Sequence, residues 1–141
     1  MRALAFALGL SLCTDVASAE ANIAGHWTFK ANIADECDFG GTAHLEKTGE
    51  NRFKGELTAR QSCTSLPEDY LVRQACEASR FGNQLSVRCR IVEFINGFES
   101  EYYYPDNFTL TIQSSQRMYG ALRSAGSANP AEWIRDEGGI S

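Results

Sequence analysis

Apolar and polar residues alternate along most of this chain, and short turn motifs separate the alternating runs. The run that contains Trp27 is apolar at every second position, and so are the runs around Leu57, Leu110 and Met118. A period of two residues is typical of strands with one buried face, whereas helices repeat about every 3.6 residues. The pattern therefore predicts an all-β protein without a long helix.

The alternating runs predict about nine strands, at 26–33, 40–47, 52–62, 70–80, 84–95, 98–104, 107–113, 117–124 and 131–135. Short connections make sequential neighbours pair, which gives an up-and-down antiparallel meander. A meander of eight or nine strands with one apolar face closes into a barrel, because closure removes the exposed strand edges. A two-sheet sandwich is the alternative fold, although its crossings need longer connections than most of those found here.

Cys76 and Cys89 are expected to form a disulfide, because a tight turn places them opposite each other. The turn at 82–83 pairs Arg80 with Leu85 and, further along the ladder, Cys76 with Cys89. The Cα atoms of such a non-hydrogen-bonded pair lie about 4.5 Å apart. That separation is within the range that disulfides accept.

Cys37 and Cys63 remain as the second pair. A three-residue loop at 49–51 would pair Leu45 with Gly55 and bring the two cysteines close together. A zinc site is the alternative use of these four cysteines, but no two of them have the short spacing that is usual for zinc ligands. The sequence therefore predicts two disulfides.

The dipeptide at 96–97, Asn-Gly, predicts a further hairpin, because it suits the positive φ angles of a type I′ turn. This hairpin would pair Ile95 with Phe98 and Ile91 with Tyr102. It is the basis for a ninth strand at 98–104.

The same register turns a small polar and aromatic set to the barrel interior: Gln74, Glu93, Tyr102 and Tyr104. A buried carboxylate is costly without partners, so an inward Glu93 beside tyrosines predicts a ligand cavity with polar anchors. The alternative is that Glu93 lies in water at the end of the barrel. Alternation turns Tyr103 outward, where aromatic residues indicate a contact surface for a protein or ligand. Ordinary packing of outer-face tyrosines explains the same pattern.

Length and charge restrict the function further. A chain of 141 residues that is 43% hydrophobic is expected to form one globular domain. Its 13 Lys and Arg residues against 18 Asp and Glu residues give a net charge of -5. This balance argues against general nucleic-acid binding, which needs a basic surface.

Residues 1–19 have the features of a secretory signal peptide. Arg2 precedes the apolar run at 3–12, and the small residues at 17–19 form a cleavage site. We therefore expect the barrel domain to comprise residues 20–141, without a transmembrane segment, in the periplasm or outside the cell. The paired cysteines agree with an oxidising compartment.

The residues that catalysis or metal binding would need are sparse. The two histidines, His26 and His44, lie on polar strand faces, and no serine lies in a nucleophile-elbow sequence. An acidic loop at 35–38 lacks the further oxygen ligands of a calcium site. The sequence therefore predicts no enzyme, no catalytic residue, no metal and no cofactor.

The first predicted strand begins with Gly25-His26-Trp27, which resembles the Gly-x-Trp motif of the calycins, the group of lipocalins, fatty-acid-binding proteins and avidins. The resemblance implies a β-barrel in which Trp27 closes one end and a late arginine packs across the indole. Arg123 and Arg135 are the two candidates for that arginine.

The same segment, with Cys37 soon after it, is similar to small exported bacterial inhibitors of metalloproteases. This resemblance implies that residues 20–24, which precede the barrel, would insert into a protease cleft. Two hypotheses follow. The first is a non-enzymatic exported barrel that binds a small apolar ligand or a protein partner. The alternative is a proteinase inhibitor that acts through its N-terminal segment.

Overall fold

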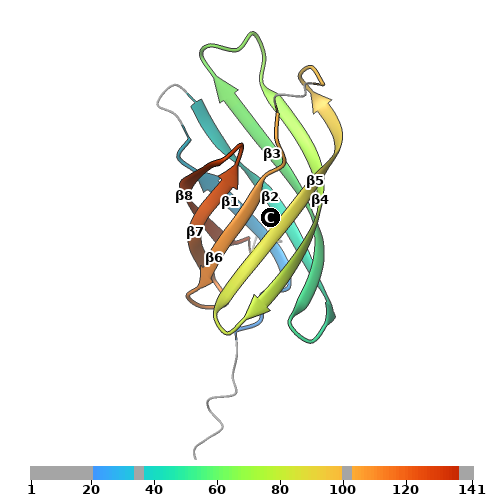
Figure 1. Ribbon diagram of the computed structural model, residues 1–141, viewed down its shortest axis with the longest axis vertical. Coiled ribbons are helices and arrows are strands. Elements are labelled where there is room, and N and C mark those ends of the chain that lie inside the picture. The colour runs from blue at the N-terminus through green and yellow to red at the C-terminus, as the bar shows by residue number, and fades with distance from the viewer. Residues whose placement is uncertain (1–20, 34–36, 100–102, 137–141) are drawn as a thin grey trace, which may run out of the picture.

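The chain folds into eight antiparallel strands that close into one barrel (Figure 1). The computed structural model describes residues 21–33, 37–99 and 103–136. The strands are β1 (Gly25–Ala31), β2 (Cys37–Gly49), β3 (Arg52–Cys63), β4 (Tyr70–Phe81), β5 (Gln84–Asn96), β6 (Asn107–Ile112), β7 (Arg117–Ser124) and β8 (Ser127–Arg135). Each strand pairs with its neighbour in sequence, and β1 pairs with β8 to complete the ring. The predicted all-β up-and-down barrel is therefore confirmed.

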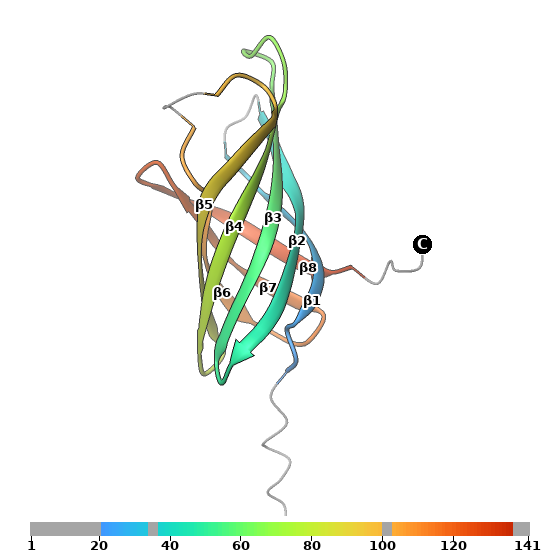
Figure 2. The ribbon, with the colours of Figure 1, turned by 90° about the vertical axis from the view of Figure 1, so that its right-hand side faces the viewer.

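The wall of the barrel is uneven in height. β3, β4 and β5 extend beyond β6, β7 and β8 at one end (Figure 2). β5 has 13 residues but pairs with β6 only over Gln84–Val87. We call this end the mouth; it carries the β3–β4, β5–β6 and β7–β8 connections. The opposite end, where residues 21–24 enter β1, is called the floor.

Both predicted disulfides are confirmed. The turn at 82–83 pairs Arg80 with Leu85 and Cys76 with Cys89, and a disulfide joins these cysteines. The second disulfide links Cys37 to Cys63 at the expected rung of the β2–β3 ladder. Each disulfide joins adjacent strands of one hairpin.

The predicted hairpin at 96–97 is wrong. β5 ends at Asn96, and residues 98, 99 and 103–106 are not in a strand. A type I′ turn needs positive φ at both central residues, but among the described non-glycine residues only Asn51 and Ala125 have it. Instead, the Asn96 side chain donates a hydrogen bond to the Asp69 carbonyl at 2.6 Å. The chain therefore leaves β5 in a long connection, and the barrel has eight strands.

The lower interior of the barrel is filled by large side chains. Trp27, Trp133, Phe29 and Phe108 are each at most 1% exposed. Their rings pack with centroid separations of 5.2–6.3 Å, from Phe108–Trp133 to Trp27–Trp133. This region is a packed aromatic core.

The floor is closed by the chain segment that precedes β1. Ile23 is 1% exposed, and its carbonyl accepts a hydrogen bond from Trp27 Nε1 at 2.9 Å. The Arg135 guanidinium lies over the Trp27 ring, 4.5 Å from its centroid, and donates to the carbonyls of Asn22 and Ala24. The segment is therefore fixed by apolar burial and by hydrogen bonds.

Gly25 is required beside that guanidinium. Its φ is +119°, and a Cβ added there would lie 2.5 Å from Arg135 Nη1. Any other residue would therefore strain the backbone and require the end of the Arg135 side chain to shift.

No stretch of the described residues forms a helix with the length and apolar character needed to cross a membrane.

Candidate ligand-binding site

A recess of about 320 Å³ opens at the mouth of the barrel. The β3–β4, β5–β6 and β7–β8 connections all contribute to its lining, which comprises Gln61, Leu66, Tyr70, Tyr103, Tyr104, Asp106, Ser124 and Ala125. Its volume is at the lower end of the range for small-molecule sites, about 300–1,000 Å³. The recess therefore suits a small molecule.

Aromatic rings make up one side of the recess. The Tyr70 and Tyr103 ring centroids lie 5.1 Å apart, and Phe94 packs against both rings at 6.0 and 5.8 Å. Phe94 is the cross-strand partner of the fully buried Val72, so its ring lies on the inward face of β5. The tyrosine rings that line this side of the recess are therefore held in position by their packing against Phe94 and against each other.

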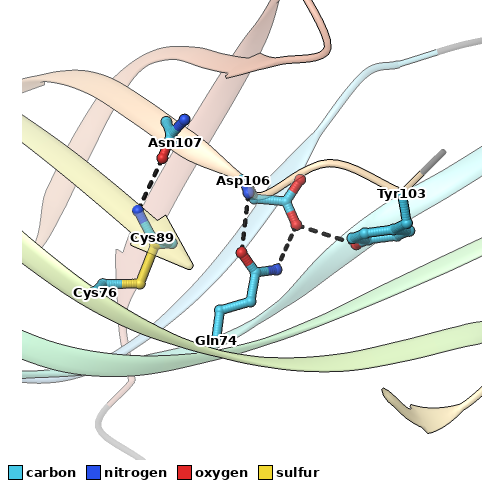
Figure 3. The surroundings of a disulfide bond; sticks show 6 residues. All are labelled: Gln74, Cys76, Cys89, Tyr103, Asp106 and Asn107. Atoms are coloured by element: carbon cyan, nitrogen blue, oxygen red, sulfur yellow. Dashed lines mark hydrogen bonds between the residues drawn. A yellow bond between two sulfur atoms is a disulfide. The ribbon is translucent and has the colours of Figure 1, made fainter. Parts of the chain in front are cut away.

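A polar network lies beneath these rings (Figure 3). Gln74 is fully buried and makes two bonds with Asp106: its Nε2 donates to Asp106 Oδ2 at 2.7 Å, and its Oε1 accepts from the Asp106 amide at 2.9 Å. The Tyr103 hydroxyl donates to the same Oδ2 at 3.0 Å. The other Asp106 oxygen points away from Gln74 and Tyr103 (Figure 3).

Asn107 extends the network to the barrel wall. Its Oδ1 accepts a hydrogen bond from the Cys89 amide at 2.8 Å, beyond the last backbone pair of β5 and β6. Together, the side chains of Asp106 and Asn107 attach the start of β6 to the β4–β5 hairpin, where the two strands separate.

Burial changes the titration of both acidic groups in the network. It raises the pKa of the Asp106 carboxyl from 3.8 to about 6, even though the hydrogen bonds from Gln74 and Tyr103 lower it. Burial, followed by the nearby Asp106 charge, raises the pKa of the Tyr103 phenol far above its usual value. At neutral pH, the Asp106 carboxyl is therefore ionised. The Tyr103 phenol keeps its proton and donates a hydrogen bond to this carboxylate.

No ion pair among the described residues includes Asp106. Its two side-chain partners, Gln74 and Tyr103, are neutral groups. Asp106 is only 2% exposed, so water screens its charge weakly. The Asp106 carboxylate is therefore a buried negative charge that accepts hydrogen bonds from neutral groups but has no positively charged partner among the described residues.

The prediction that Glu93 points inward is wrong. The β4–β5 ladder shifts between Gln74, which pairs with Ile91, and Arg73, which pairs with Glu93. This irregularity adds one residue to β5 and turns Glu93 outward, where its side chain is 50% exposed and bonds Arg73 at 2.8 Å. The alternative, a solvated Glu93 near the strand end, agrees with the structure.

The tyrosines of the β5–β6 connection also differ from the prediction. Tyr104, expected inside, is 48% exposed at the rim, and Tyr103, expected outside, is half-buried. The expected alternation assumed a strand paired with β5, and this segment is not a strand. Tyr102 lies outside the described residues. Among the four predicted ligand-binding residues, Gln74 lies within the barrel and Tyr104 lines the recess.

Sequence reasoning missed Asp106, although a signal for it was present. Phe108, Leu110 and Ile112 share the inward face of β6, and Asp106 continues that spacing one step before the strand. Extending the period of two by one position would have placed a carboxylate inside the barrel.

The histidines lie on the outer wall. His26 and His44 are cross-strand partners whose rings stack with centroids 4.3 Å apart. Within the described ranges, no group of three or more His, Cys, Asp or Glu residues is arranged to hold a metal. Of the acidic loop, Asp38 is exposed in β2, while Asp35 and Glu36 lie outside the described residues.

Of the two arginine candidates for Trp27, Arg135 packs over the ring. Arg123 instead donates from Nε to Thr109 Oγ1 at 3.0 Å, because β7 places it beside β6 and away from the floor.

No family model and no curated protein matches the chain. Three solved structures that are similar to it are designed or redesigned β-barrels. A redesigned β-barrel matches with a TM-score of 0.59 and 11% identity over 82% of this chain and 92% of that one. The redesigned barrel mFAP1, bound to DFHBI, has a TM-score of 0.56 and 10% identity over 80% and 94%. A de novo designed fluorescence-activating barrel has a TM-score of 0.54 and 14% identity over 87% and 98%. At these identities, the likeness shows the fold alone.

Proposed function

We propose that this protein is a non-enzymatic, exported barrel that binds a small molecule at its mouth. The observation that carries the proposal is the recess of about 320 Å³, lined by three tyrosines with the buried Asp106 among them. Rings held by Phe94 and a carboxylate held by Gln74 supply apolar contact and a polar anchor in fixed positions. The barrel mFAP1 binds DFHBI, so an architecture of this kind accommodates a small ligand.

The proposed position of the ligand differs from the cavity in the barrel interior that the sequence pattern predicts. The lower interior is occupied by the aromatic core around Trp133, so the ligand belongs at the mouth. The rim also carries Tyr104, Phe98 and Ile95, which are 48%, 70% and 48% exposed. We propose that these residues contact the outer part of the ligand.

Export is part of the proposal. The signal-like residues 1–19 lie outside the described residues, but two disulfides agree with an oxidising compartment. The Gly25–Trp27–Arg135 arrangement at the floor supports a relationship to calycins, which we likewise propose.

The alternative function, protease inhibition through residues 20–24, is less well supported. Ile23 is buried under the barrel, and the carbonyls of Ala21, Asn22 and Ala24 accept hydrogen bonds from Arg80 or Arg135. Insertion into a protease cleft would break these contacts. Deleting this segment would also remove part of the floor, so the deletion does not separate the two functions.

Filling the recess tests the proposal. Leu66→Trp places a large ring in the mouth, whereas Ile134→Trp adds the same ring to the outer face of β8, where Ile134 is 42% exposed. Binding of a panel of small aromatic compounds to the mature, oxidised protein would be followed by ligand-observed NMR. We expect Leu66→Trp to abolish binding and Ile134→Trp to leave it unchanged. Equal binding by both variants would place the site elsewhere and refute the proposal.

A further inference from the structure

The chemistry of the mouth restricts the class of ligand. Asp106 is 2% exposed, and the polar groups that bond its carboxylate in the described structure, Gln74 Nε2 and Tyr103 Oη, carry no charge. The eight described residues that line the recess include no Lys, Arg or His. An ionised carboxylate in such a place is stabilised most by a positive charge that arrives from outside.

The tyrosine rings favour the same kind of charge. An aromatic ring attracts a cation that lies within about 6 Å of its face, and several rings around one point form a cage for ammonium groups. Tyr70 and Tyr103 pack against each other, with ring centroids 5.1 Å apart, and both residues line the recess. Tyr104 lines the same recess from the rim.

The position of the second carboxylate oxygen completes the arrangement. Oδ2 of Asp106 takes both hydrogen bonds, from Gln74 and Tyr103, while the other oxygen points away from these partners (Figure 3). Because Asp106 belongs to the lining of the recess, this oxygen is the atom we assign to the ligand.

We infer that the ligand of this recess is a small organic cation, whose substituted ammonium group pairs with Asp106 beside the tyrosines that line the recess. The inference rests on the proposed function and specifies its ligand class. An anionic ligand would be repelled by Asp106. A neutral ligand would leave the buried carboxylate without an opposite charge.

Choline and its uncharged isostere, in which carbon replaces the quaternary nitrogen, test the role of the charge. Both compounds have nearly the same shape, so a difference in affinity reports the positive charge. Titration calorimetry of the mature, oxidised protein at neutral pH is expected to show choline binding at least about tenfold more tightly than the isostere. Benzylamine and benzyl alcohol form a second matched pair, for a primary ammonium group on a flat ring.

Asp106→Asn tests the anchor. The amide has the size of the carboxylate, and its oxygen retains the ability to accept from Gln74 and Tyr103, so the fold is expected to persist. The variant is expected to bind the cations at least about tenfold more weakly and the neutral compounds as before. Glu93→Gln removes an exposed carboxylate of the outer wall and serves as the matched control, with unchanged affinities.

The outcomes separate the two proposals. If the neutral isosteres bind as tightly as the cations, or if Asp106→Asn keeps full cation affinity, the cation inference is refuted and the small-molecule function remains. If neither member of either pair binds at millimolar concentration, both are refuted. Phosphatidylcholine vesicles distinguish a free cation from a lipid head group: we expect no co-sedimentation, and co-sedimentation would refute the assignment to a free small molecule.

Discussion

The two ends of the barrel each contain a charged side chain, but its surroundings differ. At the floor, Arg135 lies over Trp27 and donates to backbone carbonyls of the entering segment, so its donors are used within the protein. At the mouth, Asp106 is buried among neutral groups, and one of its oxygens points away from them. The floor therefore has the contacts expected of a stabilising region, whereas the mouth has the unbalanced charge on which the proposed binding function depends.

Burial of side chains has opposite effects on the free energy of folding at the two ends of the barrel. Burial of Trp27 and Ile23, at 0% and 1% exposure, stabilises the fold through the hydrophobic effect. Burial of Asp106 opposes folding at neutral pH, since its raised pKa means that the ionised form is less favourable in the folded protein than in water. Holding an ionised carboxylate at a fixed position in the mouth therefore lowers the stability of the fold.

Trp27→Ala is expected to have the largest effect. It removes a fully buried side chain together with the surface on which Arg135 rests, and such truncations cost about 3–5 kcal/mol of unfolding free energy. Urea unfolding followed by the fluorescence of Trp133 measures the change. A loss below about 1 kcal/mol would show that the floor is not the stabilising end.

Asp106→Asn is expected to change the pH dependence of stability. The folded protein holds this proton more tightly than the unfolded chain, so the wild-type free energy of unfolding falls as pH rises from 3.8 to about 6. At about 1.4 kcal/mol per pKa unit, this group accounts for roughly 3 kcal/mol. The variant lacks this decrease.

Urea unfolding of both proteins across this pH range tests the prediction, because other titrating groups cancel in the difference. The variant should gain stability relative to the wild type as pH rises. A difference that is constant with pH would contradict the burial of the charge.

Glu93→Gln is expected to have the smallest effect. The bond from Glu93 to Arg73 is exposed to solvent, and such pairs contribute about 0–1 kcal/mol. Thermal unfolding should therefore shift little. A loss above about 2 kcal/mol would indicate that Glu93 supports the barrel interior, as the sequence pattern first indicated.

The two glycine turns of the β4–β5–β6 region show how far the sequence predicts this fold. At 82–83, positive φ at Gly82 and close strand partners give the expected register through to Cys76–Cys89. At 96–97, Gly97 packs against Tyr70, and Asn96 bonds to the β3–β4 connection. The second motif has the residues of a hairpin, but tertiary contacts determine its conformation.

The candidate site was less predictable than the fold, because it depends on interruptions of regular structure. The extra residue in β5 moves Glu93 outside, and the irregular β5–β6 connection exchanges the expected orientations of Tyr103 and Tyr104. Strict alternation cannot reveal either change. Strict alternation does predict the inward orientation of Gln74, because this residue lies in the regular part of the β4–β5 ladder, before the register shift at Arg73.

The positions of the disulfides have a consequence for how the ring closes. One links β2 to β3 and the other β4 to β5, with sequence separations of 26 and 13, so neither crosses the junction of β1 with β8. Both disulfides lie between β1 and β8 in the sequence, so oxidation shortens the covalent path between the first strand and the last without joining these strands to each other. Because the cost of closing a loop varies only with the logarithm of its length, this shortening lowers the cost only slightly. Bringing these distant strands together retains most of its entropic cost, which noncovalent contacts such as those of Arg135 must offset.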